Sequence, residues 1–179
     1  LLTFDDGPTP GVTESVMDKL EEFNTSAIFF MVGEKIQKHP ELAKQISDRG
    51  QTIGNHTFSH NLDSKNSAHE IDLCQDILHQ ATGNLCKFYR HPAGSINLKS
   101  LFLPKQKGLQ YVHWSCDPLD WDCKSNNDGI EAANRLLKSV KPGDIILLHD
   151  FDYPVLALLD VALPELKKRD LLQQPGEML

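Results

Sequence analysis

Short apolar runs alternate along the chain with stretches in which apolar residues recur at helical spacing. The runs predict buried strands at residues 1–4, 27–32, 52–54, 87–89, 110–115 and 144–148. The helical spacing predicts helices at residues 12–23, 40–49, 67–82, 130–140 and 155–168. This alternation indicates about six repeated β-α units, and hence an α/β fold with a parallel sheet.

Two architectures are compatible with this order of elements. The first is an incomplete (β/α) barrel, because about six units fall short of the eight in a complete barrel. The second is a doubly wound open sheet.

Three residues carry signals for helix boundaries. Thr13 is a candidate N-cap, Pro40 suits a first helical turn, and Pro164 is expected to interrupt the last helix near its end.

Length and composition describe an ordinary folded domain. The chain has 179 residues, of which 40% are hydrophobic and 24% charged, as in globular proteins with one core. Its net charge is −7 and it has no long run of Lys or Arg, which argues against nucleic acid or an anionic membrane surface as a partner. No apolar stretch approaches the ~20 residues that cross a bilayer. The chain starts inside a predicted strand, so we expect that its N-terminus, with any targeting segment, has been removed.

The four cysteines do not form a metal-binding or redox motif. They are Cys74, Cys86, Cys116 and Cys123, and no two of them have the C-x-x-C spacing. Cys116 and Cys123 are close enough in sequence to form a disulfide, and free, partly buried thiols are the alternative.

Polar residues that can carry chemistry directly follow the predicted strands. These residues are Asp5, Asp6, His56, His60, Arg90, residues 117–121, His149 and Asp150. Because the carboxyl ends of parallel strands share one edge of an α/β sheet, where active sites form, we expect these side chains to line one cleft.

A metal site is predicted at this edge. His56 and His60 are four residues apart, which places two imidazoles on one face of a helical turn that Asn55 could cap. Such a pair also arises by chance on exposed turns. Asp6 is the best candidate for a third ligand, and three protein ligands leave a position open for water, as in catalytic rather than structural metal sites.

The consecutive carboxylates of Asp5 and Asp6 can have different tasks. On a regular strand they would face opposite sides, but Gly7 and Pro8 end the strand and allow both to face the cleft. One can then bind metal while the other acts as a base whose pKa the cation lowers. The alternative is an ordinary Asp-Gly turn at the surface. Arg90 could hold the free carboxylate of Asp5, or be a surface arginine.

His149 ends the most apolar predicted strand. It is either a core histidine or a general acid, and its place in the presumed cleft favours the acid. Asp117 and Asp120 could orient this imidazole and keep it protonated. Trp121 could form a wall of the cleft against a sugar ring, or simply pack.

Five short motifs occur in an order that is specific to one enzyme family. They are residues 3–7 (TFDDG), 56–60 (HTFSH), 90–94 (RHPAG), 117–121 (DPLDW) and 147–149 (LLH). Together they resemble the polysaccharide deacetylases with a NodB-type domain, also called carbohydrate esterase family 4. The resemblance implies an α/β fold, a distorted (β/α) barrel with about six or seven strands, formed by residues 1–179 as a single catalytic domain.

The resemblance also implies a role for each motif residue. Asp5 would be the general base, held by Arg90, and His149 the general acid, held by Asp120. The backbone N–H of Ala93 would stabilise the oxyanion. The family often has Tyr at this position, so we expect the departure to affect the shape of the substrate groove and not the chemistry. The implied metal ligands are Asp6, His56 and His60.

The implied reaction is metal-dependent removal of N-acetyl groups from a polysaccharide or oligosaccharide that contains N-acetylglucosamine, such as peptidoglycan or chitin. The ligand types favour Zn²⁺, and Co²⁺, Ni²⁺ or Fe²⁺ could bind the same set. The resemblance favours an extracytoplasmic location. Alternatives are an acetyl ester hydrolase acting on xylan, a deformylase-like or allantoinase-like C–N hydrolase, and a catalytically inactive carbohydrate-binding domain.

Overall fold

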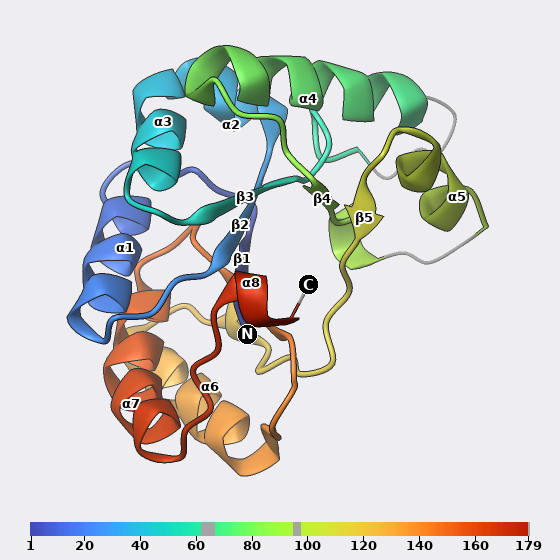
Figure 1. Cartoon of the computed structure of the whole chain (residues 1–179). Coiled ribbons are helices and arrows are strands. Elements are labelled where there is room, and N and C mark those ends of the chain that lie inside the picture. The colour runs from blue at the N-terminus through green and yellow to red at the C-terminus, as the bar shows by residue number, and fades with distance from the viewer. Residues whose placement is uncertain (62–66, 95–97, 179) are drawn as a thin grey trace. The chain divides into compact units, whose positions relative to one another are not determined.

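A computed structural model describes residues 1–61, 67–94 and 98–178 (Figure 1). The chain divides into two compact units. The first unit comprises Leu1–Asp5, Thr9–Ile28 and Trp114–Leu179. The second unit comprises Asp6–Pro8 and Phe29–His113. In the described ranges, no helix has the length and apolar character needed to span a bilayer.

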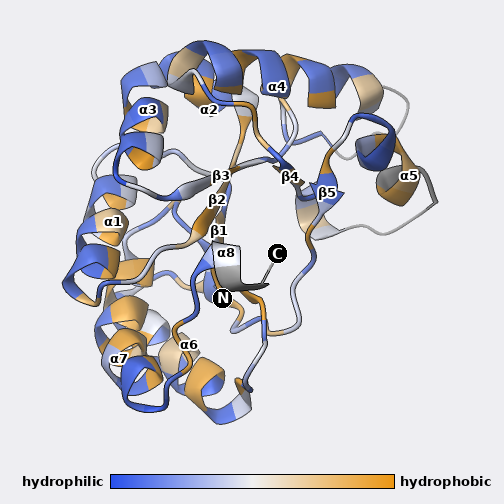
Figure 2. Cartoon of the chain, in the orientation of Figure 1, coloured by the Kyte–Doolittle hydropathy of each residue, from blue (hydrophilic) through white to orange (hydrophobic). Residues whose placement is uncertain are grey.

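The first unit is built around two parallel strands. Strand β1 (Leu2–Asp5) pairs with β6 (Ile146–His149) in a register that runs from Leu2 opposite Ile146 to Asp5 opposite His149. Its helices are α1 (Val12–Glu22), α6 (Asn126–Ser139), α7 (Pro154–Lys168) and α8 (Pro175–Met178). Helix α7 packs against α6 and α1. Apolar and polar residues alternate around α6 and α7 in Figure 2, as expected of helices that bury one face.

The second unit holds the remaining strands in the order β5-β4-β3-β2. They are β2 (Ile28–Met31, whose first residue belongs to the first unit), β3 (Thr52–Asn55), β4 (Phe88–Tyr89) and β5 (Gln110–Tyr111). The β3–β4 and β4–β5 pairs are parallel. The helices are α2 (Gly33–Lys38), α3 (Pro40–Asp48), α4 (Ser67–Thr82) and α5 (Leu98–Gln106). Helix α4 packs against α2 and α3.

Most predicted elements are confirmed, and the exceptions are local. Helix α2 was not predicted because its six residues bury only Gly33 and Ile36, which is too short a pattern to show periodicity. Helix α5 was also not predicted, and it contains Pro104. The strand predicted at 110–115 ends at Tyr111. The helix predicted at 130–140 begins earlier, because Ser125 caps it by accepting a hydrogen bond from the backbone N of Asp128.

Two predictions about helix boundaries were wrong. The N-cap of α1 is Gly11 rather than Thr13, and its backbone N donates to the carboxylate of Glu14 at 2.6 Å. Helix α7 continues through Pro164 to Lys168. Leu163 beside this proline is completely buried, which indicates that packing outweighs the missing backbone donor.

Thr13 has a different task, which leads to a prediction about stability. Its hydroxyl accepts a hydrogen bond from Thr9 N at 2.8 Å and donates one to Asp150 Oδ2 at 2.5 Å, and both Thr13 and Asp150 are fully buried. We expect Thr13→Val to lower the free energy of unfolding by about 2 kcal/mol, because it removes a hydrogen bond to a buried carboxylate. Chemical denaturation would measure the change. In a control, Thr82→Val removes hydroxyl contacts with Leu78 and Asn84 that lie near the surface and involve no charged group, and it should lower the free energy of unfolding by less than about 1 kcal/mol. If both substitutions lowered the free energy of unfolding equally, the prediction would be contradicted.

Candidate functional site

Four of the five motifs lie where strands end, as the sequence predicted. The motif at residues 117–121 does not, because β5 already ends at Tyr111 and Cys116 forms only an isolated bridge with Ile146. Strand β1 ends at Asp5, β3 at Asn55, β4 at Tyr89 and β6 at His149. The chain therefore leaves regular structure at the residues that the sequence singles out for chemistry.

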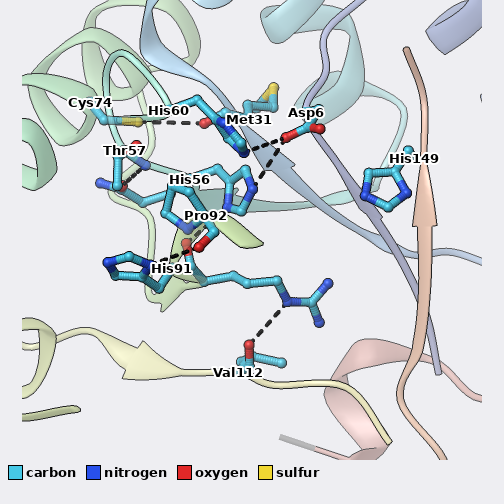
Figure 3. A network of polar contacts seen from close by, with 12 residues as sticks. Asp6, Met31, His56, Thr57, His60, Cys74, His91, Pro92, Val112 and His149 are labelled. Carbon is cyan, nitrogen blue, oxygen red and sulfur yellow. Dashed lines mark hydrogen bonds and ion pairs between the residues drawn. The ribbon is translucent and has the colours of Figure 1, made fainter. Parts of the chain in front are cut away.

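Three predicted metal ligands converge in the second unit. The Oδ1 atom of Asp6 lies 3.3 Å from Nε2 of His56 and 3.0 Å from Nε2 of His60. The three ligand atoms lie within 4.8 Å of one another. Figure 3 shows the carboxylate of Asp6 facing both imidazoles. His56 is almost completely buried, whereas the side chain of His60 is 38% exposed. This group has the donor atoms and the spacing that a single divalent cation requires.

The electrostatics of Asp6 fit a cation. Burial alone would raise the pKa of its carboxyl, but the close imidazoles of His56 and His60, when they carry a proton on Nε2, outweigh that effect and hold the pKa well below its usual range. A cation bound by neutral imidazoles would supply the same positive charge in place of those protons. The Oδ1 atom is buried and accepts no hydrogen bond of normal geometry, although both imidazole nitrogens are near. An ionised oxygen in this position is suited to a metal ion rather than to a proton donor.

His56 is held in the tautomer that a metal ligand needs. Its Nδ1 lies 2.8 Å from the backbone carbonyl oxygen of Arg90. Because a carbonyl can only accept, Nδ1 must carry the hydrogen, and the neutral ring then has its lone pair on Nε2, the atom near Asp6. A hydrogen bond from the second ring nitrogen to a carbonyl is common among metal-binding histidines.

The helical turn predicted for the two histidines was wrong. Residues 56–60 are not helical, and Thr57 and His60 have φ angles of 67° and 55° in the left-handed region. Asn55 does not cap a helix. Its Oδ1 accepts a hydrogen bond from Thr57 N at 3.0 Å and so stabilises a turn that starts with Asn. The two imidazoles still converge, because the tight turn replaces the helix in bringing them together.

The candidate base and acid occupy adjacent strand ends in the first unit. Asp5 and His149 are register partners of β1 and β6, and Asp5 is 3% exposed. Asp120 binds His149 twice, through Oδ1 to the ring Nδ1 at 2.9 Å and through Oδ2 to the backbone N at 2.7 Å. Burial raises the pKa of Asp120, and the contacts with His149 oppose this shift. The predicted orienting carboxylate is thus Asp120, while Asp117 accepts a hydrogen bond from Leu119 N.

The other predicted residues differ in exposure. Arg90 is completely buried, so it is not a surface arginine; its Nε donates to Val112 O at 3.1 Å and its guanidinium lies 4.2 Å from the centre of the Phe30 ring. The contact of its guanidinium with the carboxylate of Asp5 stays a prediction. Ala93 lies in a short 3₁₀ helix (Pro92–Gly94) with a φ of 52°. Trp121 lies in a second one (Asp120–Asp122) and is 52% exposed, which argues against a packing role.

The cysteines form no disulfide, and two carboxylates make contacts that the sequence does not indicate. All four cysteines are free and buried, so the alternative of free thiols holds. Sequence reasoning gave no role to Glu70 and no partner to Asp150. Glu70 binds Ser59, eleven positions earlier, and Asp150 binds Thr13. No local pattern in the sequence indicates either contact.

Comparisons with known proteins agree with these motifs. Residues 1–112 match the family described as polysaccharide deacetylase. A peptidoglycan-N-acetylglucosamine deacetylase of Bacillus cereus is 38% identical, over 94% of this chain and 81% of that protein. A chitooligosaccharide deacetylase of Azorhizobium caulinodans is 36% identical, over 83% of this chain and 72% of that protein.

A solved structure shows the fold class. The peptidoglycan deacetylase PdaC from Bacillus subtilis superposes with a TM-score of 0.88 at 28% identity, over 99% of this chain and 87% of that one. The predicted class, an α/β fold of the distorted (β/α) barrel type found in NodB domains, is confirmed. Together, the sequence match and the shared fold assign the chain to the polysaccharide deacetylase family.

Proposed function

We propose that this chain removes N-acetyl groups from a polysaccharide that contains N-acetylglucosamine, such as peptidoglycan or a chitin-like polymer, and releases acetate. The observation that carries the proposal is the convergence of Asp6, His56 and His60, with Asp5 next in the chain to the metal-binding carboxylate. The names of the relatives support the substrate class. Cell-wall polymers lie outside the cytoplasm, so the proposal includes an extracytoplasmic site of action.

The metal requirement follows from the family and from the ligand set. Deacetylases of this family are generally metal-dependent, and Asp6, His56 and His60 form a group that can hold an ion. We propose Zn²⁺, because two imidazoles and one carboxylate are ligands that zinc accepts in catalytic sites. When bound, such an ion lowers the pKa of water and polarises a carbonyl group.

The chain's own residues have separate tasks in the proposed reaction. Asp5 takes a proton from the water molecule that attacks the acetyl carbonyl carbon. The backbone N–H of Ala93 donates a hydrogen bond to the carbonyl oxygen as negative charge develops there. His149 then gives a proton to the sugar nitrogen while the C–N bond breaks, and the products are acetate and a free amine.

Asp120 prepares His149 for this last step. Its Oδ1 contacts the ring Nδ1, so Nδ1 carries a hydrogen and Nε2 is the nitrogen that can transfer the proton. Arg90 is proposed to hold the carboxylate of Asp5, and its complete burial is consistent with a structural charge rather than a solvated one. Trp121 is proposed to contact the sugar, because it exposes a large aromatic surface on the motif that carries Asp120.

The proposed reaction implies a defined substrate and a metal requirement. We expect the purified chain to release acetate from peptidoglycan or from N-acetylglucosamine oligomers, to lose this activity on removal of metal by a chelator, and to regain it with Zn²⁺ or Co²⁺. Acetate release would be measured on these substrates and on acetylated xylan. Preference for the xylan ester would contradict the proposed N-deacetylase, and full activity in the metal-free protein would contradict the metal site.

A substitution at Asp5 separates the base from the metal ligands. Asp5→Asn should lower kcat by about 10²- to 10⁴-fold, because the amide cannot accept the proton, while the metal content stays at the wild-type level. Activity and metal analysis on the same preparation would test this. Asp76→Asn, which changes an exposed carboxylate of α4, serves as the control and should leave both values unchanged. Full turnover in the Asp5 variant would refute its assignment as base.

A substitution at His149 tests the acid through the choice of leaving group. His149→Ala should reduce release from an N-acetyl sugar by about 10²-fold or more, since the departing amine needs a proton. An activated aryl acetate, whose leaving group departs as a stable anion, should lose less than about tenfold. Asp120→Asn should show the same selectivity in a weaker form. An equal loss on both substrates would indicate a structural defect in place of lost proton donation.

A further inference from the structure

The segment that carries the two histidines is tied to the start of helix α2. The backbone N atoms of Gly33 and Glu34 donate hydrogen bonds to the carbonyl oxygens of Thr57 and Phe58, at 3.0 and 2.8 Å. A Cβ atom at Gly33 would lie 2.6 Å from the Phe58 ring and 2.9 Å from its Cα, so only glycine permits this approach. These bonds fix the middle of the segment, before it reaches His60.

A carboxylate of helix α4 fixes the next residue. Glu70, in the first turn of α4, uses one oxygen atom, Oε2, to accept hydrogen bonds from both the backbone N and the hydroxyl of Ser59, at 2.7 and 2.9 Å. Ser59 directly precedes His60 in the chain. Glu70 therefore determines where the backbone stands one residue before the second histidine.

The two histidines depend on their surroundings to different degrees. His56 directly follows β3, its backbone N donates to Met31 O at 3.1 Å, and its ring is buried and bonded to Arg90 O. His60 lies at the end of a non-helical turn, has a left-handed φ of 55° and a side chain that is 38% exposed. Its position therefore relies more on the conformation of the preceding residues than that of His56 does.

We propose that Glu70 is a positioning residue that sets the affinity of the metal site by holding Ser59, and through it His60. The inference rests on the proposed metal site of Asp6, His56 and His60. Without the carboxylate, His60 would have to be ordered when the ion binds, and the cost of that ordering would appear as weaker binding. Residues that orient metal ligands from outside the ligand set typically contribute about 10- to 100-fold to affinity, and we expect a loss in this range.

Three variants test this assignment by direct metal titration. The metal-free protein would be titrated with Co²⁺ and with Zn²⁺ against a competing chelator. Glu70→Ala should bind each ion about 10- to 100-fold more weakly. Glu70→Gln should stay within about threefold of wild type, because a single amide oxygen can accept both Ser59 bonds that Oε2 accepts now. Asp76→Ala removes an exposed carboxylate from the same helix and should bind like wild type.

The possible results decide the question. Wild-type affinity in a folded Glu70→Ala variant would overturn the proposal, and so would a Glu70→Gln variant as weak as Glu70→Ala, since charge rather than position would then matter. Thermal unfolding of the metal-free proteins shows whether each variant is folded. If Glu70→Ala does not fold, Ser59→Ala decides: it removes one of the two bonds, and an affinity loss of about fivefold supports the proposal while no loss overturns it. A wild-type protein that binds neither ion would instead refute the metal site itself.

Discussion

The end of strand β1 between two consecutive carboxylates is the constraint on which the candidate site depends. Asp5 is the last strand residue and stands opposite His149, whereas Asp6 has a φ of 72° and turns its carboxylate to the imidazoles of His56 and His60. A left-handed conformation costs a residue other than glycine about 1–2 kcal/mol. Without this turn, the strand would direct the two carboxylates to opposite faces, and consecutive residues could not supply both the proposed base and the metal ligand.

The same kind of backbone recurs in the other motifs. Of the seven residues other than glycine with positive φ in the described parts of the chain, five lie in the motifs: Asp6, Thr57, His60, Ala93 and Leu119. For Thr57 the conformation is especially unfavourable, because its side chain is branched at Cβ. Hydrogen bonds to Asn55 and Gly33 hold it there. Strain that is held in place by surrounding contacts is typical of functional sites, and here it aims side chains that regular structure would direct elsewhere.

The sequence could predict that Asp6, His56 and His60 meet, but not how they do so. Apolar runs located the strands, and the rule that parallel strands end at one edge identified Asp6, His56 and Arg90. The spacing of His56 and His60 was interpreted as a helical turn, which was wrong because Asn55 and Glu70 stabilise a different turn through contacts that no periodicity shows. The positions at strand ends already favoured a metal ligand, a base and an acid, and the family resemblance then gave each motif residue a definite role. Periodicity and spacing alone left a core histidine and a surface turn as alternatives.

Arg90 shows how the motifs support one another through the main chain. Its carbonyl oxygen fixes the tautomer of His56, while its guanidinium is buried near Phe30 and donates to Val112. Any residue at this position can offer the carbonyl oxygen to His56, whereas the contacts with Phe30 and Val112 need an arginine side chain. A side-chain change at position 90 should therefore leave the hydrogen bond to His56 intact as long as the end of β4 keeps its place. Loss of metal in such a variant would indicate a displaced backbone, and loss of turnover alone would indicate the missing charge.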